Sequence, residues 1–139
     1  MRRAFTITEL IVTVCILSIL SAIAIPWAGR VLDRVRVRSA AVEIESLFSA
    51  ARHIAIARAA QATVDIDTVA RSIKVSVGSD TIRSRDVGAA HDVLISASRV
   101  RMSYSATGMG YGAANLSVVV RRNASVDTVF VSRLGRVRH

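Results

Sequence analysis

Residues 10–25 form an uncharged, predominantly apolar run, which constrains the fold more than any other feature of the chain. The run contains no charged side chain, follows Glu9 and ends at Pro26. Residues 5–25 would extend about 31 Å as a helix, which matches the hydrocarbon core of a bilayer. The sequence therefore predicts a membrane-spanning helix, and a helix buried in a soluble core explains the run less well.

Two other kinds of N-terminal segment share some of these features. Arg2 and Arg3 followed by a short apolar stretch are typical of a secretory signal, with residues 22–24 as a small-residue cleavage site. A plain single-pass anchor is the second alternative. Neither explains Glu9, because hydrocarbon disfavours a carboxylate by roughly 2.5 kcal/mol or more. An acid in this place therefore suggests a partner and a specific role.

The segment from Ala4 to Pro26 resembles the class III signal of type IV pilins and type II secretion pseudopilins. The resemblance implies that a prepilin peptidase cuts between Ala4 and Phe5 and methylates the amine of Phe5. It also implies that Glu9 pairs with this amine on a neighbouring subunit, and that Pro26 has a place in assembly. The family usually has glycine where this chain has Ala4, so we expect less efficient cleavage.

A second helical pattern follows Pro26, because apolar residues recur at three- and four-residue steps from Trp27 to Ile54 among charged ones. This pattern predicts an amphipathic helix that ends near Ala60. Alternating or β-branched segments then predict strands over residues 63–67, 72–77, 81–85, 93–98, 101–105, 116–122 and 126–132. The predicted fold is α+β, with one long N-terminal helix, half membrane-spanning and half amphipathic, packed on a small antiparallel β-sheet domain.

The outer part of the chain is similar to the GspH/FimT family of type II secretion pseudopilins and type IV minor pilins. The similarity rests on Tyr104–Gly108, the valine-rich hairpin and the final residues 131–138. It implies a leader at residues 1–4, a transmembrane helix at 5–29 and a globular domain at 30–139. Other (pseudo)pilins, a prepilin peptidase and the inner membrane are the implied partners. Arg2 and Arg3 keep the N-terminus cytoplasmic, which predicts a periplasmic C-terminal domain.

The positive charge of the chain suggests an anionic partner. The formal net charge is +9, and only Lys74 of the nineteen basic residues is not arginine. Residues 135–138, Gly-Arg-Val-Arg, match a pattern of DNA-binding FimT-like minor pilins of transformable bacteria. In an extended tail past the last strand, Arg136 and Arg138 would point to one side and grip phosphates. The further DNA-binding candidates are Gly135, Arg121, Arg122 and Arg133, opposed by Asp127 alone. A solvated basic end is the alternative.

The sequence has no recognisable catalytic, cofactor or metal motif. His53, His91 and His139 have no ligand-spaced partner, and Cys15 is the single cysteine. The glycines at 108, 110 and 112 predict a turn or bulge and not a phosphate loop. We therefore expect a structural (pseudo)pilin subunit, a minor component, that is not an enzyme. The alternatives are a minor pilin that binds DNA for uptake and a membrane-anchored binding domain that never polymerises.

Overall fold

A computed structural model describes residues 6–111 and 115–138 of the chain. Ala4 and Phe5, where processing is expected, lie outside the described residues. The chain divides into two compact units, with the boundary between Leu32 and Asp33. Helix α1, Ile7–Ala57, contributes residues to both units.

The described part of the first unit is the N-terminal portion of α1. Its side chains from Ile7 to Leu32 are all exposed. Among the described residues, α1 is the one helix long and apolar enough to cross a membrane, judged by length and composition. An exposed apolar surface of this length is what a lipid-facing segment requires, because apolar side chains are more stable in contact with lipid hydrocarbon than with water.

The second unit contains two antiparallel sheets and a short helix. One sheet has the strand order β3-β2-β1-β5-β6 and the other has the order β4-β7-β8-β9. The elements of the first sheet are β1 Ala62–Asp67, β2 Ser72–Val77, β3 Asp80–Arg85, β5 Arg101–Tyr104 and β6 Gly110–Tyr111. The remaining elements are α2 Val87–His91, β4 Leu94–Ala97, β7 Leu116–Arg122, β8 Ser125–Val131 and β9 Val137–Arg138.

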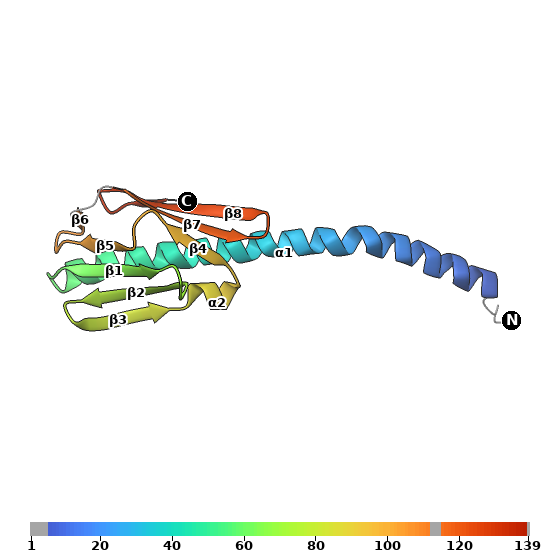
Figure 1. The fold of residues 1–139 in the computed structure, drawn as a ribbon, viewed down its shortest axis with the longest axis horizontal. Coiled ribbons are helices and arrows are strands. Elements are labelled where there is room, and N and C mark those ends of the chain that lie inside the picture. Colours follow the sequence, from blue (N-terminus) through green and yellow to red (C-terminus); the bar gives the residue numbers. More distant parts are fainter. Residues whose placement is uncertain (1–5, 112–114, 139) are drawn as a thin grey trace. The chain divides into compact units, whose positions relative to one another are not determined.

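Both sheets lie along the C-terminal part of α1 (Figure 1), and their buried residues form a single core with α1 residues 37–55. Ile44, Leu47 and Phe48 supply the large buried side chains of the helix. Alanines at positions 40, 41, 51 and 55 are fully buried between them, and their small side chains let the strands approach the helix closely. On the strands, burial alternates with a period of two, as in Leu116–Arg122. The amphipathic pattern of the sequence therefore becomes the interface between helix and sheets.

The fold predicted from the sequence is confirmed: a long N-terminal helix packs against antiparallel β-structure. The seven predicted strands are all present, with ends that differ by at most one residue. The helix ends at Ala57 and not near Ala60, because Ala59 adopts a positive φ of 46°. The strands form two sheets, a division that the sequence pattern did not predict.

Two segments expected as loop or free tail are ordered elements. Residues 87–91 form α2, which is too short to show a helical period in the sequence. Residues 137–138 form β9, so the expectation that Arg136 and Arg138 lie past the last strand is wrong. A turn over Ser132–Gly135, closed by the hydrogen bond from the Gly135 N–H to the Ser132 carbonyl (2.9 Å), reverses the chain. Residues 137–138 then pair with β8.

Candidate functional site

Glu9 lies in the first turn of α1 and forms a capping box with Thr6. The Thr6 backbone N–H donates to the Glu9 carboxylate (3.0 Å), and the Glu9 N–H donates to the Thr6 hydroxyl (3.3 Å). The Thr6 hydroxyl also donates to the same carboxylate oxygen at 2.9 Å. Reciprocal bonds of this kind satisfy backbone donors that a helix leaves unpaired at its start.

The capping box gives Glu9 a local role that sequence reasoning missed. The signal was present as Thr6-x-x-Glu9 directly before an apolar run, which is the sequence pattern of a capping box. The other assembly candidate, Pro26, lies inside α1, and the helix continues on both sides of it. The proposed pairing of Glu9 with a neighbouring subunit remains a prediction.

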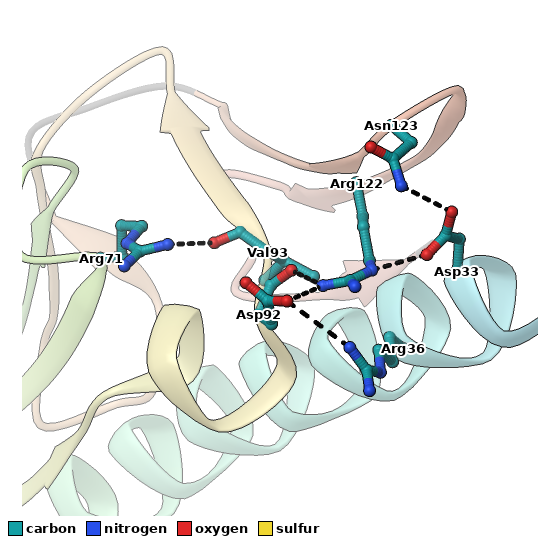
Figure 2. Close-up of polar contacts among 7 residues, drawn as sticks. All are labelled: Asp33, Arg36, Arg71, Asp92, Val93, Arg122 and Asn123. Carbon is teal, nitrogen blue, oxygen red and sulfur yellow. Dashed lines mark hydrogen bonds and ion pairs between the residues drawn. The ribbon is translucent and has the colours of Figure 1, made fainter. Parts of the chain in front are cut away.

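Arg122 is the centre of an ion-pair network and not part of an open basic surface (Figure 2). Its Nε donates to Asp33 of α1 (2.6 Å), and its Nη1 contacts both the carboxylate and the backbone carbonyl of Asp92. Asn123 donates to the second oxygen of Asp33 (2.8 Å), and Arg36 pairs with Asp92 (3.5 Å). The network joins α1, the β7–β8 turn and the α2–β4 connection.

The charges in this network stabilise one another. Hydrogen bonds from Asn123 and then Arg122 lower the pKa of the Asp33 carboxyl. The hydrogen bond from Arg122 lowers the pKa of Asp92, and the two carboxylates together raise the pKa of Arg122. Because Arg122 is held by two acids with its side chain 20% exposed, it is a poor phosphate ligand. Its inclusion among the DNA-binding candidates is therefore not supported by the geometry.

The four-stranded sheet sorts its charged residues onto two faces. Arg122 and Asp127 point to the helix side, where Asp127 pairs with Arg38 of α1 (3.3 Å). Arg121 and Arg138 point to the opposite, outer face, since Arg138 is the register partner of the exposed Phe130. The acid expected to offset the basic residues thus lies on the other side of the sheet. None of the described residues of the four strands places a carboxylate on the outer face.

A groove of about 570 Å³ lies on this outer face beside the C-terminal tail. We call it the tail groove, and its lining residues are Asn115, Leu116, Ser117, Phe130, Val131, Ser132, Leu134, Arg136 and Arg138. Phe130 and Leu134 are 58% and 61% exposed there. The geometry therefore brings Arg136 and Arg138 together around an apolar floor, while Arg121 lies farther along the same face.

Gly135 has a structural role in the tail and no side chain to offer a ligand. Its φ is +74°, and an added Cβ would lie 2.7 Å from the Gly108 carbonyl oxygen and 3.2 Å from the Tyr104 ring. Arg133, in the same turn, is exposed, and its carbonyl accepts a hydrogen bond from the Gly110 N–H (3.1 Å). Glycine at this position lets the turn pack on Tyr104, whose burial raises its pKa to about 12.

Within residues 6–111 and 115–138, no group of three or more His, Cys, Asp and Glu side chains is arranged to hold a metal ion. His91 instead lies 2.7 Å from Glu43, and Asp65 pairs with Arg101. Asp65 is therefore part of an ion pair between β1 and β5.

Replacing Arg122 with alanine should lower the unfolding temperature of the domain by several degrees at pH 7. Asp33 and Asp92 have depressed pKa values in the folded chain. Their contribution to the free energy of unfolding is therefore fully present above the unfolded pKa of about 3.9, and it is lost as the pH falls through the folded pKa values. The difference between wild type and variant should therefore shrink on acidification. Thermal unfolding of the full chain in detergent, followed by circular dichroism at pH 7 and in acid, measures it.

Arg121→Ala is the matched control, because Arg121 is the preceding residue and faces solvent on the outer side. It should leave the unfolding temperature nearly unchanged at both pH values. Equal effects of the two substitutions would contradict a specific role for the Arg122 network.

Gly135→Ala should destabilise the domain more than Gly78→Ala. Both glycines have a positive φ, which costs an alanine about 1–2 kcal/mol. An alanine at 78 would meet nothing within 4 Å, whereas one at 135 would also clash with the Gly108 carbonyl oxygen. Chemical denaturation of the two variants checks this difference, and equal free energies of unfolding would show that the turn relaxes without cost.

No protein-family model matches the sequence, and no curated protein matches it significantly. Two solved structures are similar in fold, both crystal structures of the type IV minor pilin FimU from Pseudomonas aeruginosa strain PAO1. The first has a TM-score of 0.65 and 16% identity, covering 76% of this chain and 88% of FimU. The second has a TM-score of 0.62 and 15% identity, covering 73% and 90%. The chain therefore has a pilin-like fold, a long N-terminal helix packed against antiparallel sheets.

Proposed function

We propose that the chain is a structural subunit, a minor component, of a type II secretion pseudopilus or a type IV pilus. The observation that carries the proposal is the pilin-like fold built on a helix whose N-terminal part is apolar and fully exposed. A soluble domain gains nothing from such a helix, whereas a filament can bury it against the helices of neighbouring subunits.

The proposal includes a route from membrane to filament. The precursor would cross the inner membrane once, with the globular domain in the periplasm, and a prepilin peptidase would cut between Ala4 and Phe5. The apolar, exposed surface of α1 supports residence in the membrane before assembly. The methylated amine of Phe5 and the carboxylate of Glu9 would then pair between subunits. Two opposite charges that meet inside an apolar filament core cost less than either would alone.

The capping box allows a sharp test of Glu9. Glu9→Gln keeps an acceptor for the Thr6 N–H but removes the charge, so the helix start is preserved. We expect membrane insertion to be unchanged and incorporation into purified filaments to fall at least about tenfold, because an amide cannot neutralise an amine. Immunoblots of sheared filaments against the membrane pool measure the incorporated fraction.

Thr6→Val is the matched control for this test. It removes the hydroxyl that bonds to Glu9 but retains the carboxylate, so incorporation should stay near wild type. If Glu9→Gln assembles normally, Glu9 serves the helix cap and not assembly. If neither the wild type nor the control enters filaments, the chain is a membrane-anchored domain that does not polymerise.

A second candidate function is DNA binding, as in FimT-like minor pilins that take up DNA. The observation that favours it is the tail groove, where Arg136 and Arg138 converge on a face without carboxylates among the described strand residues. Guanidinium groups bind phosphate oxygens in a bidentate manner, and an unopposed cationic face attracts a polyanion.

If these two arginines contact phosphates, replacing both with alanine should reduce the slope of log affinity against log salt by about 1.8 on duplex DNA. The loss of affinity should be similar for unrelated sequences, because phosphate contacts carry no sequence information. Fluorescence anisotropy of the full chain in detergent over a salt series measures both quantities.

Arg83→Ala with Arg99→Ala is the charge-matched control, since both residues are exposed and outside the tail groove. This control should change the slope much less. A wild-type chain that does not bind DNA at low salt, or tail and control variants with equal slopes, would remove the DNA-binding function and leave the structural one.

A further inference from the structure

The tail groove combines two features that a simple phosphate-binding tail does not need. Its cations, Arg136 and Arg138, border an exposed aromatic ring, Phe130, which is 58% accessible. Phe130 is central in its row of the sheet, because Ser117 pairs with it on one side and Arg138 on the other. Neighbouring side chains in such a row lie about 5 Å apart, so the guanidinium of Arg138 is within reach of a ligand on the ring.

The neighbours of Phe130 leave its ring open. Ser117 is small, and the next outward residue on β8 is Thr128, so no bulky side chain flanks the ring within the strand. Leu134 extends the apolar floor from the adjacent turn and is 61% exposed. Phe130 and Leu134 thus both contribute exposed apolar surface to a groove of about 570 Å³ that the two arginines also line.

A ligand that fits this groove has an apolar, planar group and successive negative charges along the side of it that faces the tail, where both arginines lie. Duplex DNA presents its phosphates but keeps its base faces stacked inside the helix. A single strand offers both phosphates and unpaired bases, and stacking on aromatic side chains with cationic tracking of the backbone is the general way in which proteins bind single strands. The outer face continues this cationic track. Arg121 lies on the same face of β7, four residues after Ser117.

We propose that the tail groove is a subsite for single-stranded nucleic acid, in which a base stacks on Phe130 while Arg136 and Arg138 contact the flanking phosphates. The inference rests on the DNA-binding function proposed above and specifies its ligand. It makes Phe130 a determinant of strand preference: the arginines recognise any polyphosphate, whereas the ring recognises an unstacked base.

The test compares three fluorescent probes on the full chain in detergent at low salt. They are an oligothymidylate, a duplex of equal length, and an abasic phosphodiester strand with the same charge. Phe130→Leu keeps an apolar side chain but removes the aromatic face. We expect it to weaken binding of oligothymidylate by about tenfold, a typical size for one stacked base. Binding of the duplex and of the abasic strand should change less than about twofold.

Two variants serve as controls. Phe130→Tyr retains the ring and should keep the oligothymidylate affinity of the wild type. Val69→Leu alters another exposed apolar residue, which lies outside the tail groove and outside the four-stranded sheet, and it should have no effect on any probe. Circular dichroism of each variant confirms that the fold is intact.

The failures of the two proposals can be distinguished. If Phe130→Leu binds oligothymidylate as well as wild type while Arg136→Ala with Arg138→Ala does not, the stacking subsite is wrong and the phosphate contacts stand. If wild type binds none of the three probes, both proposals fall. If a polyglutamate peptide competes with oligothymidylate and loses affinity equally on Phe130→Leu, the groove recognises an acidic polypeptide and the inference is overturned.

Discussion

The structure depends on the burial of one stripe of α1 against two sheets. Residues 37–55 of the helix contribute eight buried side chains, and the strands of both sheets close over them. Burying a side chain such as Phe48 or Ile44 contributes about 1.5–3 kcal/mol, so this stripe supplies much of what holds the domain together. With no cysteine in the domain, packing and polar contacts alone maintain it.

Because the four-stranded sheet has one face on the helix, it separates two kinds of arginine. Those on the helix side, such as Arg122, meet the acids of α1 and of the α2–β4 connection, and they act as structural clamps. Those on the outer side, Arg121 and Arg138, have no carboxylate opposite them among the described strand residues. Residues adjacent in sequence therefore have different roles, since successive side chains on a strand point to opposite faces.

Pairing with the sheet also holds the C-terminal tail in one conformation. The turn at Gly135 packs on Gly108 and Tyr104, and β9 adds its residues to the edge of the sheet. Arg138 is thereby held beside Phe130, and Arg136 borders the same groove. A free tail would lose conformational entropy on binding a ligand, whereas a tail already ordered by the sheet has met that cost during folding.

The sequence by itself determined the apolar segment, the amphipathic stripe that follows Pro26 and the location of the strands, because each is encoded in a local period of hydrophobicity. It also carried the Thr6–Glu9 cap, which is a contact between residues three apart. The tertiary structure alone decided that Arg122 is paired, that Asp127 faces the helix and that Phe130 joins Arg136 and Arg138 in one groove. These contacts join residues up to 89 positions apart, and their geometry depends on strand register and on the turn at Gly135, which no local pattern specifies.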